Sequence, residues 1–187
     1  YAIDKRIPRR VFNDGWTRCI DVNIPVLNIE KWNKVKYDLE KTLGFLSGDV
    51  WKFNFRSTLE KFRGNKVSKY NLVKNKEFDC VSLFSGGLDS FCGAVKLLEE
   101  KKSICFVGFK EYGHLEKRQK QIYDILEKNY SKTNKEILLF NGTPYAPMID
   151  NKKDNKYNIG VESTSRSRSF LFIAGALAIA AIVGDDI

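Results

Sequence analysis

Residues 78–90 read FDCVSLFSGGLDS, and this stretch decides the fold. A short apolar run leads into two glycines, and a helical pattern follows from Asp89 to about Glu100. Further short apolar runs occupy 104–109 and 136–140, with a second helical pattern over 114–130 between them. Short apolar strands that alternate with longer helices predict βαβ units and a parallel sheet covered on both faces.

The turn after the first of these strands has the composition of a phosphate loop. A helix start gathers unpaired amides and the positive end of the helix dipole, and so attracts an anion. Gly86 and Gly87 let the backbone approach phosphate oxygens, and Ser85 and Ser90 add hydroxyl donors. Asp89 is explained if it holds a Mg²⁺ that bridges the phosphates, and the alternative is a Gly-Gly turn with Asp89 as a helix cap. The loop is not a Walker loop, because no GK[ST] follows.

The hexapeptide of this loop resembles the SGGxDS signature of the PP-loop ATP pyrophosphatases. Members of that superfamily cleave ATP between the α and β phosphates and transfer AMP to an oxygen of the substrate. The resemblance covers 78–187 and implies a Rossmann-like adenine nucleotide α-hydrolase fold, with ATP and Mg²⁺ as cofactors. It implies that the adenine is read by backbone groups of Val107, Gly108 and Phe109. It also implies that the pyrophosphate part of ATP is held by Ser85, Gly86, Gly87, Leu88, Asp89 and Ser90, with Asp89 on the Mg²⁺.

Within the superfamily, the chain is similar to the 7-cyano-7-deazaguanine synthase (QueC-like) branch. Residues 109–119, FKEYGHLEKRQ, look like the family segment FDYGQxHxxE, with His114 in the place of a glutamine. Residues 167–180, SRSFLFIAGALAIA, look like the family helix GRNxxFLSxAxAxA. This alignment implies the catalytic residues Asp89, Ser90 and Arg168. It implies the substrate residues Tyr112, Gly113, Glu162, Ser163 and Arg166.

Two arginines flank the start of the last predicted helix, which runs from about Ser165 to Val183. Arg166 and Arg168 oppose the helix dipole there, and an ATP phosphate would offset that cost. The alternative is a pair of surface arginines anchored to Glu162 or Asp185. His114 fits a helix-start residue better than a substrate contact.

Residues 1–76 predict a small α+β unit that precedes the nucleotide-hydrolase domain of 77–187. The stretches 18–27 and 50–56 alternate as strands, and 28–43 forms an amphipathic helix between them. Asn28 is the expected N-cap of that helix and Gly44 its expected stop. The housekeeping synthase lacks such an extension. The extension resembles the QueC-like (QatC-type) proteins of bacterial anti-phage operons, which implies other defence-operon proteins as partners.

The composition excludes disordered, collagen-like and disulfide-scaffold classes, because 43% of the 187 residues are hydrophobic and 29% charged. The net charge of +9 suggests an anionic partner, a phosphate-bearing ligand or a nucleic acid, and does not distinguish the two. Of these, a nucleic acid is the partner that is not favoured. Four cysteines without a CxxC pair, and His114 as the single histidine, predict buried reduced thiols of a cytoplasmic protein. The zinc cluster of the family would need residues beyond Ile187.

The apolar run 170–183 is too short to span a bilayer and predicts a buried core helix. The β–α rhythm calls for a strand after this helix. We therefore expect further sheet from residues beyond 187 or from a second chain, and an associating protein when that sheet is absent.

Together these observations lead to an expected function. The chain is expected to be an ATP-dependent carbon–nitrogen ligase that adenylates the carboxylate of a 7-deazaguanine-type substrate, releases pyrophosphate and serves phage defence. The first alternative is a PP-loop tRNA-modifying ligase or thiolase. The second is an ATP-binding defence subunit without turnover.

Overall fold

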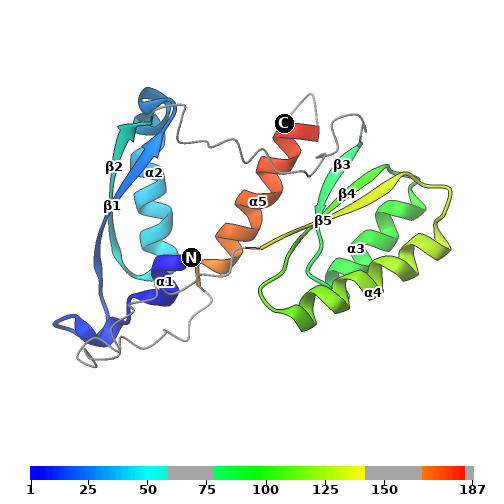
Figure 1. Ribbon diagram of the computed structural model, residues 1–187, viewed down its shortest axis with the longest axis horizontal. Coiled ribbons are helices and arrows are strands. Elements are labelled where there is room, and N and C mark those ends of the chain that lie inside the picture. Colours follow the sequence, from blue (N-terminus) through cyan, green and yellow to red (C-terminus); the bar gives the residue numbers. More distant parts are fainter. Residues whose placement is uncertain (59–77, 142–165, 184–187) are drawn as a thin grey trace. The chain divides into compact units, whose positions relative to one another are not determined.

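The computed structural model describes residues 1–58, 78–141 and 166–183, which divide into two compact units (Figure 1). The first unit contains 1–58 with Arg166 and Ser167, and the second contains 78–141 with 168–183. The predicted connections over 63–76 and, apart from Asn141, over 141–163 lie outside the described residues, as do Glu162, Ser163 and Asp185.

The second unit is the predicted alternation of strands and helices. Its elements are β3 (Cys80–Leu83), α3 (Leu88–Glu99), β4 (Ile104–Phe109), α4 (Gly113–Asn129), β5 (Lys135–Phe140) and α5 (Arg168–Val183). The strands form one parallel sheet in the order β3-β4-β5, with Val81 opposite Cys105 and Phe106 opposite Ile137. The parallel α/β architecture is thereby confirmed, with a small sheet.

The apolar core of this unit lies between the sheet and the helices that connect its strands. Every residue of β4 is buried, as a central parallel strand requires. The cluster of fully buried side chains comprises Phe84, Ala94, Leu98, Ile104, Phe106 and Leu126.

Helix α5 packs against β3 and β4 but is not the buried helix that its composition predicts. None of its described residues is buried, and Ile173, Leu177 and Ile182 remain about half exposed. The reason is that, within the described residues, the sheet covers one side of the helix. On that side Gly175 lies so close that a Cβ there would come 2.6 Å from the ring of Phe140.

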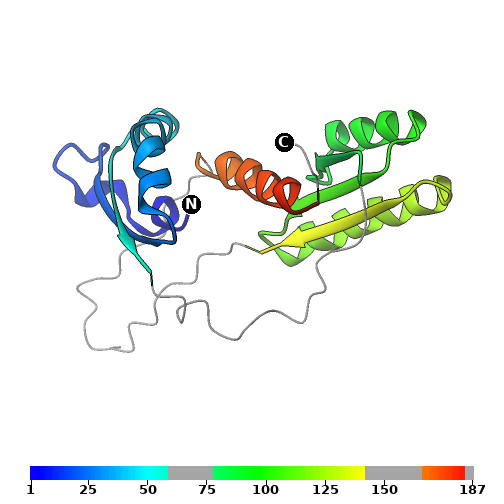
Figure 2. The same ribbon diagram turned by 90° about the horizontal axis from the view of Figure 1, so that it is seen from above.

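The first unit is also built from parallel strands, in place of the α+β arrangement expected for 1–76. After α1 (Ala2–Arg6) and the short 3-10 helix η1 (Arg9–Val11), β1 (Cys19–Val26) pairs in parallel with β2 (Val50–Ser57). Helix α2 (Ile29–Ser47) connects the two strands and lies along them (Figure 2).

The sequence prediction is correct at the start of α2 and wrong at its end. Asn28 is confirmed as the N-cap, since its side chain accepts a hydrogen bond from the amide of Lys31 at 2.9 Å. Gly44 as the stop is wrong, because the helix continues to Ser47 and ends where Gly48 takes a left-handed φ of 73°. A glycine inside a helix costs only about 1 kcal/mol, so the next glycine can supply the left-handed turn.

A buried ionic network sits in the first unit beside its aromatic core of Trp51 and Phe53. Arg18 donates to Asp49 at 3.0 Å and to Asp4 at 2.7 Å, and Arg9 donates to Asp49 at 2.8 Å. Burial raises the pKa of both carboxyls, but the hydrogen bonds from Arg18 and from Ser167 or Ser47, together with the charge of Arg18, outweigh it and hold each pKa below its usual range. The carboxylates therefore stay ionised and paired.

All four cysteines are free thiols, but only two are shielded from solvent. Cys105 is buried and Cys80 half-buried, and burial raises the pKa of Cys105 to about 11. The prediction of burial is wrong for Cys19 and Cys92, which are exposed at the start of β1 and on α3. Among the described helices, none has both the length and the apolar character that crossing a bilayer needs.

Candidate functional site

The backbone between β3 and α3 has a shape that only glycine allows at one point. Gly86 is buried and has a left-handed φ of 79°. A Cβ on Gly86 would also come 3.0 Å from Cγ of Gln119. Torsion and space therefore both require glycine at the position where the sequence predicts a phosphate loop.

The two serines of the loop come together. The hydroxyl of Ser85 donates to that of Ser90 at 3.1 Å and accepts from the amide of Gly87 at 3.3 Å. The hydroxyl of Ser90 donates to the carbonyl of Gly87 at 3.0 Å. Two hydroxyl groups thus converge at the start of α3, as a site for phosphate oxygens would need.

The start of α3 carries no side-chain cap. Gly87 is the N-cap, and as a glycine it has no side chain that could accept from the amides of the first turn. Asp89 lies exposed in the first turn of the helix, as does Leu88. The helix-cap alternative for Asp89 is therefore not what the structure shows.

Asp89 fits the role of a magnesium ligand in chemistry and place. The described residues contain no group of three His, Cys, Asp or Glu side chains that would form a protein-made metal cage. Mg²⁺ commonly uses one or two carboxylates together with substrate phosphates and water. One exposed carboxylate beside an uncapped helix start matches that pattern.

The end of β4, predicted to read adenine, is buried and closely packed. A Cβ on Gly108 would come 2.9 Å from the carbonyl oxygen of Phe84. The carbonyl of Val107 accepts from the amide of Phe84 at 2.8 Å, and that of Phe109 accepts from Gln119 at 3.3 Å. The carbonyl groups of Val107 and Phe109 are therefore engaged inside the unit.

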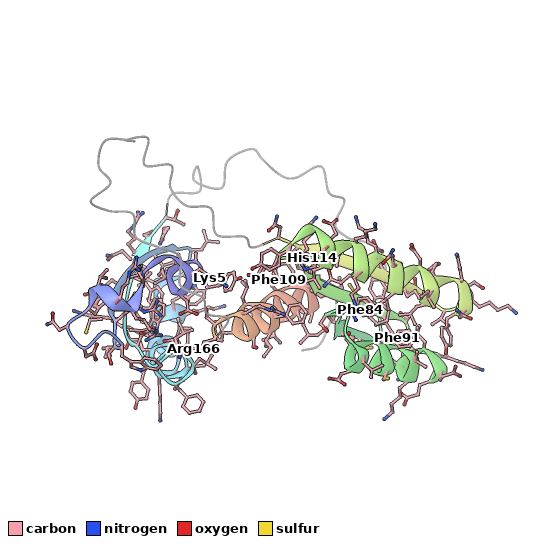
Figure 3. All side chains as sticks on the ribbon, turned by 90° about the horizontal axis from the view of Figure 1, so that it is seen from below. Lys5, Phe84, Phe91, Phe109, His114 and Arg166 are labelled. Carbon is pink, nitrogen blue, oxygen red and sulfur yellow. The ribbon has the colours of Figure 1, made fainter. Side chains whose placement is uncertain are left out.

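The loop from β4 to α4 gathers several of the predicted residues. Arg168, at the start of α5, forms an ion pair with the buried Glu111 at 3.6 Å. A hydrogen bond with Glu111, and then its charge, raises the pKa of the neighbouring Tyr112. The rings of Tyr112 and His114 stack with their centroids 5.6 Å apart. Helix α4 begins at Gly113, next to His114 (Figure 3). The structure thus brings Arg168 to the predicted substrate segment.

Arg166 lies elsewhere. It belongs to the first unit, where its guanidinium donates to the carbonyl of Ser47 at 3.2 Å and lies 4.7 Å from the ring of Trp16 (Figure 3). Arg166 therefore belongs to the first unit, whereas Arg168 belongs to the second. The other two residues predicted to contact substrate, Glu162 and Ser163, are outside the described residues.

Two residues of the site were not predicted as functional residues from the sequence. Glu111 holds Arg168, and its position directly before Tyr112 was the available signal. Gln119 contacts the ends of both β3 and β4, yet a glutamine within a highly polar helix gives no signal in sequence.

The comparisons with known proteins add no relative. No family model, no curated protein and no solved structure matches the chain. The function must therefore be argued from the site itself and from the motif resemblance.

Proposed function

We propose that the second unit binds Mg·ATP at residues 85–90 and cleaves it between the α and β phosphates. The observation that carries the proposal is the uncapped start of α3 beside the paired hydroxyls of Ser85 and Ser90. A left-handed Gly86 and a helix start without a side-chain cap form a concave set of donors suited to an anion of high charge.

The residues of the loop would divide the work of binding. Backbone amides would donate to the oxygens of the leaving pyrophosphate, and the two serine hydroxyls would turn from their present acceptors to do the same. Asp89 is the residue that would hold Mg²⁺, which neutralises phosphate charge when bound. Arg168, fixed by Glu111 and half exposed, has guanidinium donors left for an anionic group of the substrate or of ATP.

The reaction that follows is transfer of AMP. A carboxylate oxygen of the substrate attacks the α phosphorus, the bond to the β phosphate breaks, and pyrophosphate leaves with the electron pair. A nitrogen nucleophile then displaces AMP from the acyl adenylate. The resemblance to the QueC-like branch supports a 7-deazaguanine carboxylate as substrate and anti-phage defence as the setting.

The net charge of +9 supports one other candidate, a tRNA-modifying ligase or thiolase of the same superfamily. A gel shift with tRNA at increasing salt separates the two. Tight, salt-sensitive tRNA binding favours the tRNA enzyme, and its absence favours the small-molecule ligase.

The test of the proposal follows both products of ATP. With 7-carboxy-7-deazaguanine added, γ-labelled ATP should release labelled pyrophosphate and unlabelled AMP in equal amounts. Asp89→Asn should abolish most of this release without changing the melting temperature, whereas Asp124→Asn, an exposed control on α4, should leave it unchanged. ATP binding without AMP formation from any deazaguanine acid would instead identify a non-catalytic ATP-binding subunit.

A further inference from the structure

Gln119 is buried completely in a helix whose other described residues are mostly polar and exposed. The second buried residue of α4, Leu126, belongs to the apolar core cluster, and Gln119 does not. The burial of a glutamine at this place therefore needs an explanation other than packing.

The amide nitrogen of Gln119 joins the ends of two neighbouring strands. It donates to the carbonyl of Phe84 at 3.1 Å and to that of Phe109 at 3.3 Å, and it lies 3.4 Å from the carbonyl oxygen of Ser85. Phe84 and Ser85 are the residues through which β3 enters the loop. A single side chain thus holds the entry of the loop against the end of β4.

The same side chain forms the wall behind Gly86. The position of a Cβ on Gly86 is 3.0 Å from Cγ of Gln119 and 3.6 Å from its backbone nitrogen. The left-handed turn of the loop is therefore seated directly on α4.

The surroundings of the Gln119 amide oxygen indicate that the amide nitrogen is the reason for a glutamine at this position. This oxygen is buried, and no described residue donates a hydrogen bond to it. Burying an acceptor without a donor costs free energy, so an apolar side chain would suit the core better. The nitrogen is the part of the amide that is fully used.

Peptide geometry turns these contacts into an orientation of the loop. In a trans peptide the carbonyl of one residue and the amide of the next point in opposite directions. Because Gln119 draws the carbonyls of Phe84 and Ser85 toward α4, the amides of Ser85 and Gly86 point away from it. The carbonyl oxygens, which would repel an anion, therefore point away from the loop's binding side, and the amide donors point toward it.

We propose that Gln119 is the positioning residue of the phosphate loop, which fixes the loop in its anion-binding form before the ligand arrives. This inference rests on the proposed function for the nature of the ligand. Loss of the amide nitrogen lets the two carbonyls turn outward, and the site then meets the phosphates with acceptors as well as donors.

The experiment compares Gln119→Met with the matched control Gln121→Met, an exposed position on the same helix. Calorimetry on the full chain with Mg²⁺ and inorganic pyrophosphate should give a dissociation constant at least about tenfold larger for Gln119→Met. The control should bind as the wild type does. Wild-type affinity in a folded Gln119→Met protein would overturn the positioning role.

Hydrogen exchange separates this inference from the proposed function, because it needs no ligand. The amides of residues 85–87 should exchange faster in Gln119→Met than in wild type, and equal rates would overturn the inference. If the wild type exchanges slowly there but binds no pyrophosphate, the proposed function fails while the ordering of the loop by Gln119 stands.

Gln119→Glu gives a second readout that does not depend on the folding of the methionine variant. A protonated carboxyl can donate to one of the carbonyls, whereas a carboxylate repels them. The ratio of variant to wild-type pyrophosphate affinity should therefore fall as the pH rises from 5 to 8. A ratio that stays flat over this range would contradict a role for hydrogen-bond donation.

Discussion

Both units of the chain contain a parallel βαβ crossover, and the two crossover helices begin in opposite ways. In the first unit Asn28 caps α2 through a 2.9 Å hydrogen bond from the amide of Lys31. In the second, α3 begins at Gly87 without a side-chain cap. A side-chain cap satisfies an amide of the first turn of α2, whereas the first turn of α3 has no such cap and would suit the anion proposed to bind there.

The cores of the two units differ as well. The first unit buries Arg9, Arg18, Asp4 and Asp49 in one network, whereas the second is held by an apolar cluster around Phe106. Charged networks depend on every partner, since removal of one leaves another charge buried and unpaired. An apolar cluster responds to volume instead. The comparison therefore predicts that different kinds of substitution will damage each unit.

Removal of the central arginine should give the largest effect. Arg18→Met leaves Asp4 and Asp49 without their shared partner and should lower the free energy of unfolding of the first unit by about 3–5 kcal/mol. Urea unfolding followed by tryptophan fluorescence measures it, because Trp16, Trp32 and Trp51 all lie in this unit. Arg10→Met, at an exposed arginine, is the control, and equal midpoints for the two variants would contradict a charged core.

In the second unit a single methyl group should have the next largest effect. Gly175→Ala places a Cβ 2.6 Å from the ring of Phe140 and should destabilise by about 1–3 kcal/mol. Gly93→Ala is the matched control in α3, where a Cβ meets nothing within 4 Å. It should stabilise by about 0.5–1 kcal/mol. Thermal unfolding by circular dichroism compares them, and a neutral Gly175→Ala would show that α5 packs more loosely than described.

Acid should affect the first unit selectively. The pKa values of Asp4 and Asp49 are depressed in the folded chain, so the unfolded chain takes up protons first as the pH falls. The stabilisation is therefore complete above the ordinary aspartate pKa of about 4 and is lost as the pH falls through the lowered values. The tryptophan-detected midpoint should be constant from pH 7 to 5 and should drop below pH 4. An Asp49→Asn variant that loses stability equally at pH 3 and pH 7 would contradict this linkage.

The two helix starts should give the smallest differences in stability and the clearest contrast. Asn28→Ala removes the cap of α2 and should cost about 1 kcal/mol. Asp89→Ala removes no cap and should change stability by about 0.5 kcal/mol or less. Chemical denaturation of both variants measures the difference. An equal cost at the two positions would mean that Asp89 serves as a cap in solution.

The features that could be predicted from the sequence are those that depend on residues close to one another in the chain. Strand alternation, helical periodicity and the Asn28 cap were read from residues a few positions apart, and the structure confirms them. The incorrect prediction that α2 ends at Gly44 has the same local origin. Gly44 and Gly48 lie about one helical turn apart, and local sequence does not show which of them ends the helix.

What the sequence could not predict depends on partners that are distant in the chain. Arg18 meets Asp49 across 31 positions, and Gln119 meets Phe84 across 35. Periodicity carries no information about such pairs, since each residue alone is a polar side chain in a polar context. The contact of Arg166 with Ser47 could not be predicted for the same reason, because the two residues are 119 positions apart in the sequence.

The order of the strands has a consequence for synthesis on the ribosome. In both sheets the order in space follows the order along the chain, β1 to β2 and then β3 to β4 to β5. Each later strand of a sheet therefore leaves the exit tunnel after the neighbour with which it pairs has already been made. Helix α5 is the exception, because it returns to β3 and β4 only after the loop that precedes it has been synthesised. Until α5 has been synthesised, the face of the sheet that it covers stays exposed and accessible to chaperones. The residues of the phosphate loop have been synthesised by that time.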